Sequence, residues 1–523
     1  MPRWQLRTVD AALERTWVDN GWWTDETLGQ LLFDGLAAGG SQPFTVRSQV
    51  RPSTTTLGAV RRDAMRLAAG LGARGIGAGS VVSFQLPNWL EAAHVFYAAT
   101  ALGATVVPIV HFYGAKEVGY ILTRTPPDAY VTFEGFGALS GTATLTAAVA
   151  GGAPMPPLVS VVGGPESIRE WYAEDAIAAP APADPSAPAL VAYTSGTTAA
   201  PKGVIHSHRT IGFECRQLSS VQPRGARAAI VGAPVGHGIG MLAALLIPVV
   251  QRKPIHLIDV WDPGTVLAQM EQGGLLAGTG ATYFLTSLLD HPDFDPAVHA
   301  PLMSHIGLGG SAVPAAVGER SAALGISTVR MYGSTEHPSI TGCTHDDPLA
   351  KRIATDGRPL LGCELRTDDG GELLSRGPDC FMGYTDPALT HEAFDDDGWY
   401  RTEDVGTFDE DGYLTITDRV KDVIIRGGEN ISASEVEEIL ARVPGVLEVA
   451  VVAAPDARLG EHVCAFVRGV APTLAQVHAA MSAAGLAKQK WPEEIREVDA
   501  LPRTPSGKVM KVALRQQLRD VTQ

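Results

Sequence analysis

The sequence predicts an α/β protein with a large N-terminal domain (residues 1–420) of parallel and mixed sheets covered by helices, and a small mobile α+β domain (residues 421–523). Three observations support this prediction. The chain has 523 residues, whereas one hydrophobic core stops growing at roughly 250 to 300 residues. A strand–helix–strand pattern lies between residues 81 and 110. After Asp418 a turn-rich stretch begins, followed by a short helix and two strands.

The strand–helix–strand pattern is the clearest local signal. A helix is predicted over 57–71, where apolar residues recur at helical spacing before a glycine. An apolar strand is predicted at 81–86, followed by a helix over 89–102 and a second apolar strand at 105–110. Strands joined by a helix in this way pair in parallel, and helices cover the faces of their sheet.

A smaller unit is predicted at the C-terminus. After Asp418 the chain passes through a turn-rich stretch to a capped helix over 434–442 and to strands near 446–453 and 463–468. This order of elements is typical of a small α+β domain. The alternative is that these residues only extend the large domain.

Composition and charge exclude several classes of protein. Hydrophobic residues make up 45% of the chain and charged residues 19%, as in an ordinary soluble globular protein. The net charge of −16 argues against a broad basic surface, so no nucleic acid is expected as a partner. The five cysteines form no C-x-x-C pair, so neither a zinc site nor a disulfide framework is indicated, and a cytoplasmic location fits best.

No integral membrane segment is predicted. Residues 1–15 carry charged side chains and no apolar stretch, unlike a signal peptide. The longest apolar run, from Met241 to Val250, is about half the length of a membrane span. We expect it to form a buried helix.

The first candidate site is the stretch from Tyr193 to Gly203, which reads Tyr-Thr-Ser-Gly-Thr-Thr-Ala-Ala-Pro-Lys-Gly. Its backbone N–H groups and hydroxyls can surround phosphate oxygens, and Lys202 adds a positive charge. It is not the pattern G-x-x-x-x-G-K-[S/T] of nucleotide hydrolases, because Lys202 lies six residues after Gly196 and precedes a glycine. Taken alone, the stretch is also compatible with a polar surface turn.

Five further motifs follow this stretch, and the whole set favours a nucleotide-binding role for it over a surface turn. The set as a whole resembles the acyl-adenylate-forming superfamily, which includes acyl-CoA synthetases, luciferases and the adenylation domains of peptide synthetases. The resemblance covers most of the chain and is greatest to fatty-acid and cyclohexanecarboxylate-type CoA ligases. The five motifs are Gly309-Gly310-Ser311-Ala312, Tyr332-Gly333-Ser334-Thr335-Glu336, Trp399 to Asp404 (Trp-Tyr-Arg-Thr-Glu-Asp), Asp418 to Asp422 (Asp-Arg-Val-Lys-Asp) and Pro502 to Lys508 (Pro-Arg-Thr-Pro-Ser-Gly-Lys).

The resemblance implies an enzyme that joins a carboxylic acid to the α-phosphate of ATP, releases pyrophosphate and passes the acyl group to coenzyme A. The implied cofactors are ATP and Mg²⁺, because negative charge grows on the phosphoryl oxygens during the reaction and requires fixed positive charges. The nucleotide-binding positions of the family fall here on Thr194, Ser195, Gly196, Thr197, Thr198, Lys202, Gly310, Ser311, Ala312, Tyr332, Gly333, Ser334, Thr335, Asp404 and Arg419.

Three residues match catalytic positions of the family. Lys508 is the cation expected at the reacting phosphate, on a loop able to enter and leave the site. Glu336, together with Thr194, offers the hard oxygen ligands that Mg²⁺ prefers. His237 lies in Pro-Val-Gly-His-Gly-Ile-Gly, which resembles the segment beside the acyl carboxylate. The alternative for each is a solvated or purely structural side chain.

The resemblance also assigns the sugar site and the moving parts. Asp404 is expected to accept hydrogen bonds from both ribose hydroxyls, and Arg419 to donate to the same sugar. Lys421 matches the hinge about which the small domain turns. Gly427 and Gly428 would then face the channel for the pantetheine arm of coenzyme A, where glycines allow a close approach.

The segment around His237 bears on the substrate. Peptide-synthetase adenylation domains carry an aspartate there that pairs with the amino group of an amino acid, whereas residues 235–239 (Val-Gly-His-Gly-Ile) contain no acidic residue. An amino acid is therefore disfavoured, and no carrier domain is seen after Lys508, so coenzyme A is the expected acceptor. The acyl group is expected to be apolar, fatty or alicyclic, in a pocket lined by Gly238, Met241, Tyr283, Phe284, Gly309 and His337.

Two alternatives remain open: an acyl-AMP ligase that loads a carrier protein, and a non-catalytic nucleotide-binding homologue. A homodimer is compatible with the sequence. Two positions depart from the family pattern. Ala199 stands where the family often has glycine, so a positive φ there would be strained. Glu403 replaces the glycine of Arg-Thr-Gly-Asp and puts a carboxylate beside Asp404.

Overall fold

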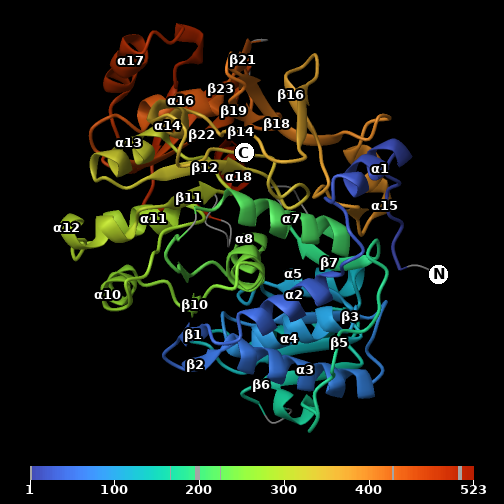
Figure 1. Ribbon diagram of the computed structural model, residues 1–523. Coiled ribbons are helices and arrows are strands. Elements are labelled where there is room, and N and C mark those ends of the chain that lie inside the picture. Colours follow the sequence, from blue (N-terminus) through green and yellow to red (C-terminus); the bar gives the residue numbers. More distant parts are fainter. Residues whose placement is uncertain are drawn as a thin grey trace.

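The chain forms a large lower part, drawn blue to yellow, with the C-terminal elements in orange and red above it (Figure 1). The N-terminal segment runs along one side beside residues near 380, where the backbone N–H of Arg7 donates to the carbonyl of Met382 at 2.8 Å. The computed structural model describes residues 3–164, 167–194, 201–223, 225–426, 429–456, 458–503 and 509–522.

The largest sheet of the described residues is mixed. Strands β3 to β7 pair in parallel, and β7 pairs antiparallel with β8. Every residue of β3, β4 and β5 is buried, as in a sheet covered on both faces. The order across the sheet is β17 (Gly383–Tyr384), β8 (Gly203–Ser207), β7 (Pro188–Tyr193), β4 (Thr105–Ile109), β3 (Val81–Gln85), β5 (Ala129–Phe133) and β6 (Leu158–Val162).

The predicted strand–helix–strand unit is confirmed by β3, α4 (Leu90–Ala101) and β4. The predicted helix before it is α3 (Leu57–Ala73), where the Thr56 hydroxyl accepts from the backbone N–H of Ala59 and satisfies one free N–H of the first turn. Helix α4 packs against both α3 and α2 (Leu28–Ala38), and the three helices lie together over the blue half of the sheet (Figure 1).

Three four-stranded sheets complete the larger part of the described chain. The first contains β2 (Ser53–Thr56), β1 (Pro43–Arg47), β10 (Ile255–Ile258) and β9 (Ile230–Val231); the second contains β11 (Ile306–Gly309), β12 (Thr328–Tyr332), β13 (Thr341–Gly342) and β14 (Arg358–Pro359); the third contains β15 (Glu364–Thr367), β16 (Glu372–Arg376), β18 (Tyr400–Phe408) and β19 (Leu414–Arg419).

Further helices connect these strands. They are α1 (Ala11–Asp19), α5 (Ala115–Arg124), α6 (Gly141–Ala150), α7 (His208–Val221), α8 (Gly238–Met241), α9 (Ile247–Val250), α10 (Pro263–Gly273), α11 (Thr282–Leu289), α12 (Pro296–His299), α13 (Ala315–Ala323), α14 (Leu349–Ala354), α15 (Pro387–Ala393), and the short 3₁₀ helices η1 (Ile168–Trp171), η3 (Ala300–Leu302) and η4 (Lys488–Lys490).

The apolar run from Met241 to Val250 is helical, but not a regular α-helix. Between α8 and α9 it forms a π-helical turn, η2 (Leu242–Leu246). Pro248 has no N–H to donate to the preceding turn, and the wider turn absorbs this defect. Leu245 and Leu246 are fully buried. The prediction of a buried helix is therefore confirmed, with a π turn in its middle.

The C-terminal elements have two small cores of their own, one on each face of a sheet. Helices α16 (Ala433–Leu440) and α17 (Leu474–Ala483) enclose one core, and α18 (Lys511–Thr522) encloses the other. The predicted capped helix begins after Ser432, whose hydroxyl accepts from the N–H of Glu435. The strands are β21 (Glu429–Ile431), β20 (Ile424–Arg426), β23 (Gly460–Gly469), β22 (Val446–Asp456) and β24 (Glu494–Glu497).

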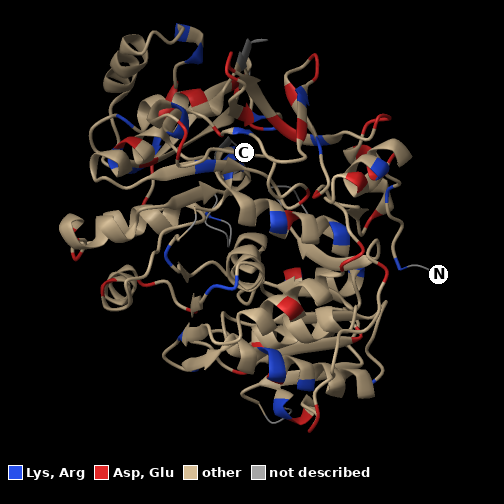
Figure 2. Cartoon of the chain, viewed as in Figure 1, with Lys and Arg blue, Asp and Glu red and all other residues tan. Residues whose placement is uncertain are grey.

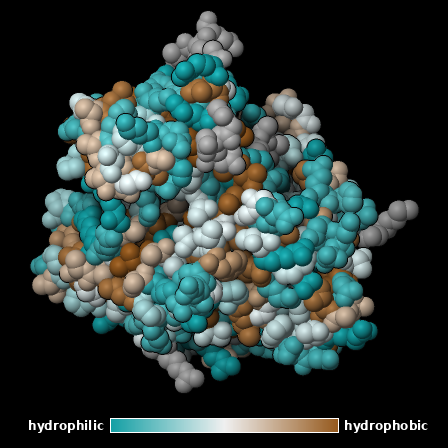
Figure 3. Space-filling view, turned by 90° about the horizontal axis from the view of Figure 1, so that it is seen from above, coloured by the Kyte–Doolittle hydropathy of each residue, from teal (hydrophilic) through white to brown (hydrophobic). Residues whose placement is uncertain are grey.

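The surface carries interspersed charges. Figure 2 shows acidic and basic positions side by side over both parts of the molecule. Seen from above, the surface is mostly hydrophilic, with smaller apolar areas between the hydrophilic ones (Figure 3). The five cysteines are buried and unpaired. Among the described residues, no helix combines the length and apolar character required to cross a bilayer.

Candidate functional site

A cavity of about 720 Å³ opens at the carboxyl ends of β7, β11 and β12. Each strand ends in one of the predicted motifs, so Thr194, Gly310 and Thr335 reach the same cavity wall from distant parts of the sequence. Parallel strands present their carboxyl ends at one edge of a sheet, and β11 and β12 are parallel. The topology therefore gathers several of the predicted motifs around one space.

The base of the predicted phosphate loop is closed by two hydrogen bonds. The backbone N–H of Thr194 donates to the carbonyl of Lys202 at 3.0 Å, and the N–H of Lys202 donates to the Thr194 hydroxyl at 3.2 Å. Both residues lie on the cavity wall. The antiparallel pairing of β7 and β8 thus holds the two ends of the loop together.

Glu336 is 8% exposed and presents its carboxylate to the cavity. The hydroxyl of Tyr384 donates to its Oε1 at 2.8 Å, and the ammonium of Lys202 lies 5.1 Å from the centre of the Tyr384 ring. Burial and the Glu336 carboxylate raise the pKa of Tyr384, so this hydroxyl remains a donor. Glu336 and the Thr194 hydroxyl on the same wall are hard oxygen donors, which fit a Mg²⁺ ion.

Arg419 lies on the next part of the cavity wall, whereas the predicted Asp404 is buried against it and is not part of the wall. The Arg419 Nε forms an ion pair with Asp404 Oδ1 at 2.9 Å, and the Tyr332 hydroxyl donates to Asp404 Oδ2 at 2.8 Å. The Asp404 carboxylate raises the pKa of Arg419, and burial followed by Asp404 raises the pKa of Tyr332. Both carboxylate oxygens are therefore engaged within the protein, so accepting two ribose hydroxyls would require these donors to move or to share their acceptor.

Glu403, next to Asp404, has a left-handed backbone with φ of +59°. Glutamate rarely adopts this conformation, whereas glycine does so without strain. Its carboxylate oxygens accept two hydrogen bonds from the Lys421 ammonium, at 2.7 and 2.8 Å. The glycine of the family pattern is thus replaced by a residue that keeps the glycine-like backbone and adds an ion pair to the predicted hinge.

His237 stands where the cavity passes from polar to apolar walls. Its ring Nδ1 accepts from the backbone N–H of Ile239 at 3.4 Å and caps α8. Ile239 and Met241 continue the wall beyond it. Gly310 faces Ile239 with φ of +77°, and a Cβ at Gly310 would lie 2.5 Å from the Ile239 side chain. The close approach of these two segments narrows the cavity at this point.

Comparison with known proteins decides the family. The sequence profile of AMP-binding enzymes matches residues 39–385, and the profile of the AMP-binding enzyme C-terminal domain matches residues 435–508. The chain is an AMP-binding enzyme. The predicted family, fold class, enzyme class and dependence on ATP are confirmed by these matches and by the relatives described next.

Two curated relatives of this AMP-binding enzyme are CoA ligases. A medium-chain fatty-acid–CoA ligase of Escherichia coli (strain K12) is 34% identical over 494 residues, which cover 90% of this chain and 87% of the relative. The 3-[(3aS,4S,7aS)-7a-methyl-1,5-dioxo-octahydro-1H-inden-4-yl]propanoyl:CoA ligase of Rhodococcus jostii (strain RHA1) is 36% identical over 480 residues, 86% of this chain and 91% of the relative. The match to each relative extends over nearly its whole length.

Solved structures agree with this family. ATP-bound MatB from Rhodopseudomonas palustris superimposes with a TM-score of 0.83 at 26% identity, covering 95% of this chain and 100% of that one. A fatty acyl CoA synthetase of Mycobacterium tuberculosis superimposes with a TM-score of 0.71 at 27% identity, covering 95% and 99%.

Several predicted site residues of this AMP-binding enzyme lie on the cavity wall. They are Thr194, Lys202, His237, Gly238, Met241, Gly309, Gly310, Tyr332, Gly333, Ser334, Thr335, Glu336, Arg419 and Lys421. Ser311 and Ala312 come directly after Gly310 in the sequence but do not line the cavity, and Ala312 is exposed. The predicted residues Ser195, Gly196, Thr197, Thr198, Gly427, Gly428 and Lys508, and the position Ala199, lie outside the described residues.

Two aromatic residues on α11 that were predicted in the acyl pocket do not line the cavity. Tyr283 is 45% exposed, and Phe284 packs edge-on against Trp261 with ring centres 4.7 Å apart. Neither residue lies on the cavity wall. The helix turns its apolar face, including Leu285 and Leu288, into the core instead.

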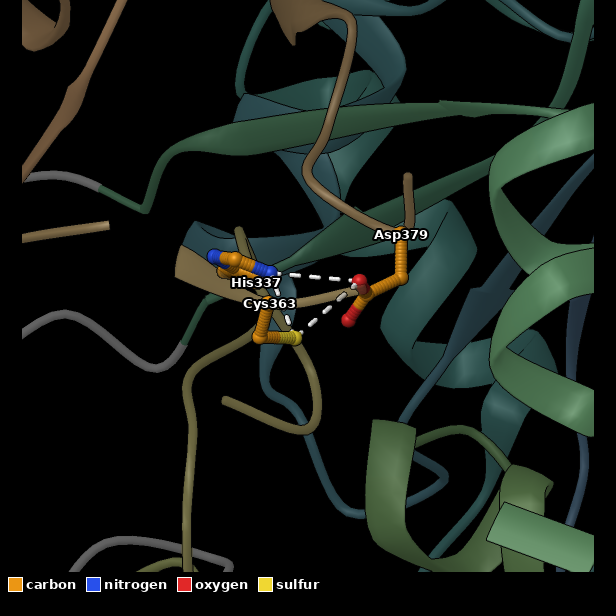
Figure 4. A group of neighbouring side chains, drawn as sticks. All are labelled: His337, Cys363 and Asp379. Atoms are coloured by element: carbon orange, nitrogen blue, oxygen red, sulfur yellow. Dashed lines mark hydrogen bonds and ion pairs between the residues drawn. The ribbon is translucent and has the colours of Figure 1, made fainter. Parts of the chain in front are cut away.

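His337 was also predicted in the acyl pocket, but it is fully buried behind the wall. Its Nε2 lies 3.2 Å from Asp379 Oδ1 and 3.6 Å from the Cys363 sulfur, and the three side chains point toward one another (Figure 4). Its Nδ1 lies 2.9 Å from the Ser375 hydroxyl. The ring is held by polar groups on both sides, so it anchors the loop that carries Glu336 rather than contacting a substrate.

The same three residue types are ligands for zinc in other proteins. Here the Cys363 thiol donates to the carbonyl of Ser339 at 3.3 Å and accepts from the amide of Gln217 at 3.3 Å. Burial, followed by the Asp379 carboxylate, raises the pKa of this thiol. A neutral, hydrogen-bonded thiol is therefore the form that the surroundings favour, and we interpret the cluster as a structural anchor.

Tyr384 is the functional residue that sequence reasoning missed. It reaches Glu336 only because β17 pairs with β8, with Tyr384 opposite Val204. No periodicity or motif at this position marks the contact. Its aromatic ring and hydroxyl would have become candidates only once the strand pairing was known.

Proposed function

We propose that this enzyme is an ATP-dependent acyl-CoA synthetase. A carboxylate oxygen of the acid attacks the α-phosphorus of ATP, the bond from this phosphorus to the bridging oxygen breaks, and acyl-AMP and pyrophosphate form. The thiol of coenzyme A then attacks the acyl carbon, loses its proton and displaces AMP to give the thioester. The observation that carries this proposal is one cavity that joins Thr194 and Lys202 at the base of the phosphate loop, Arg419, and an apolar arm beyond His237.

The first step is assigned to the polar end of the cavity. Lys202 and the loop N–H groups would hold phosphate oxygens, and Glu336 with Thr194 would hold Mg²⁺, which neutralises charge on the phosphates when bound. Tyr384 fixes the Glu336 carboxylate by its hydrogen bond. Gly310, with no side chain, lets Ile239 approach closely, and the two segments would hold the acid at the narrow part of the cavity.

The second step is assigned to a turn of the C-terminal residues about Lys421. We propose the boundary near 420 and 421, and Lys508 as the cation of the first step only. The Glu403–Lys421 ion pair supports a hinge at this position, because it joins the sugar-binding segment to the start of the C-terminal residues. Gly427 and Gly428 would face the thiol channel after the turn.

An apolar acid is the proposed substrate. Ile239, Met241, Leu242 and Ile247 line the arm beyond His237, and burying apolar area there favours binding by about 25 cal/mol per Å². The relatives named above act on a medium-chain fatty acid and on a bicyclic propanoate. Their identities of 34% and 36% support a similar class of acid for this chain.

The test is a two-part assay on the full chain. Pyrophosphate release with ATP, Mg²⁺ and a panel of straight-chain, alicyclic and aromatic acids measures the first step, and thioester formation with free coenzyme A measures the second. Lys508→Ala is expected to abolish pyrophosphate exchange while retaining transfer from supplied acyl-adenylate. The exposed Lys116→Ala on α5 is the matched control. Equal loss of both steps in Lys508→Ala would contradict its assignment, and pyrophosphate release without thioester would favour a carrier-protein acceptor.

Two further proposals concern the state of the protein. A homodimer is proposed and would be tested by light scattering of the purified chain. A cytoplasmic location is proposed because all five cysteines are free thiols, as is usual in a reducing compartment. Fractionation of expressing cells would test it.

A further inference from the structure

The apolar arm of the cavity follows a single helical stretch. From Gly238 to Gln251 the wall residues include Ile239, Ala243, Ile247 and Gln251, each four residues after the one before. Residues at this spacing share one face of a helix. The stretch spans roughly 20 Å at 1.5 Å per residue. One face of α8, η2 and α9 therefore leads from the reacting end at His237 to a far end at Gln251.

The far end is polar, unlike the middle of the arm. Gln251, Lys253 and His256 lie on the cavity wall there. Within the described residues the Gln251 side-chain amide makes no hydrogen bond; its buried Oε1 is an acceptor, so only its Nε2–H can donate to an oxygen in the cavity. In the same described part of the chain the half-buried Lys253 makes no ion pair, and partial burial lowers its pKa. The Gln251 amide oxygen has lost water without gaining a protein partner, whereas Lys253 keeps part of its hydration.

His256 adds a fixed donor to this end. Arg47 donates to its Nδ1 at 3.1 Å, and since a guanidinium only donates, the proton of the neutral ring sits on Nε2. Burial, and secondly the charge of Arg47, lowers the pKa of His256 to about 4, so the ring stays neutral near pH 7. No partner for Nε2 lies among the described residues, and the ring faces the cavity.

The charged residues on the cavity wall around Gln251 are all basic. The wall residues between 218 and 256 include Arg227 and Lys253 and no carboxylate. The acidic residues of the described cavity wall are Glu336, Glu372, Glu392 and Glu403, which lie toward the nucleotide end. A methyl group at the far end would leave the donors unpaired, whereas an oxygen acceptor would satisfy them.

We propose that Gln251, Lys253 and His256 bind a hydrogen-bond-accepting oxygen, a ketone or a second carboxylate, at the far end of the acyl group. This inference rests on the proposed function, since it names the class of acid that the same cavity takes. The relative from Rhodococcus jostii is named for an acid whose rings bear two oxo groups, which is the same chemistry. The three side chains determine specificity and take no part in the reaction.

The experiment compares acids that differ only at their far end. Pyrophosphate release by the full chain is measured with alkanoic acids, the corresponding ω-oxo acids and the α,ω-dicarboxylic acids, at matched medium and long chain lengths. The wild type is expected to favour an oxygen-ended acid about tenfold in kcat/KM at one of these lengths, equivalent to about 1.4 kcal/mol. Lys253→Met and Gln251→Leu are expected to lose this preference while keeping kcat/KM for the alkanoic acid. The exposed Lys116→Met on α5 is expected to keep the preference.

Two results would overturn the inference. One is a wild type that favours the alkanoic acid at every length, which leaves adenylation of apolar acids standing. The other is a Lys253→Met variant in which kcat/KM falls equally for all three acids. No pyrophosphate with any acid would instead overturn the proposed function and the inference together. Because the readout is pyrophosphate, the inference is tested whether coenzyme A or a carrier protein is the acceptor.

Discussion

The left-handed backbone of Glu403 allows a stability test in which two substitutions differ by one methyl group. Glu403→Gly and Glu403→Ala both remove the ion pair to Lys421, whose side chain is 51% exposed and that of Glu403 47%. Only glycine also relieves the backbone at φ of +59°. The difference between the two variants therefore isolates the strain.

The magnitude follows from two opposing effects. A left-handed conformation costs a non-glycine residue about 1 to 2 kcal/mol. Glycine also gains freedom in the unfolded chain, which reduces its advantage by about 0.5 to 1 kcal/mol. The exposed ion pair contributes about 0 to 1 kcal/mol and cancels in the comparison. We expect Glu403→Gly to be more stable than Glu403→Ala by about 0.75 kcal/mol, the difference between the midpoints of these two ranges.

Urea denaturation followed by tryptophan fluorescence measures this difference, with the free energy of unfolding taken from midpoint and slope. Lys421→Met is the control, because it removes the same ion pair and leaves the backbone of Glu403 unchanged. It should lie near Glu403→Ala. A Glu403→Ala variant as stable as Glu403→Gly would refute the strain argument.

Two other predictions concern buried polar groups. Tyr384→Phe removes the hydrogen bond to Glu336, and since bonds to charged groups contribute about 1.5 to 3 kcal/mol, KM for MgATP in pyrophosphate exchange should rise about tenfold or more. Tyr413→Phe is the matched control away from the cavity.

The second prediction concerns the buried Glu214. Burial, and secondly the Asp379 carboxylate, raises the pKa of Glu214 well above 4.5, so the folded state keeps a proton that the unfolded state loses. Stability should therefore be fully present below 4.5 and fall as pH rises, by up to about 1.4 kcal/mol per unit, and Glu214→Gln should flatten this slope in urea titrations between about pH 5 and pH 8.

A specific result would contradict each of these two predictions. If KM for MgATP were unchanged in Tyr384→Phe, the hydroxyl would not be positioning Glu336 for the nucleotide. If wild type and Glu214→Gln showed the same fall in stability with pH, the retained proton would belong to another group.

Local patterns in the sequence were enough to predict β3, α4 and β4, because short apolar runs bounded by turn residues form buried strands and a longer apolar run forms a buried helix. The resemblance to a known family, rather than any local pattern, predicted that Thr194, Gly310 and Thr335 meet, because β7 lies in a different sheet from β11 and β12. The π turn at η2 was not predicted, although Pro248 stands in the sequence as its cause.

What the sequence by itself determined is therefore the family, the order of elements and several of the motifs that line the cavity. Only the tertiary structure decided which neighbours within a motif face the cavity: Glu336 does, whereas His337, one residue later, is buried against Asp379. It also decided that Tyr384 supports Glu336 and that Gln251 ends an apolar arm with a polar group. Contacts of this kind join residues far apart in the chain, so they depend on how strands and helices pack and leave no local period to detect.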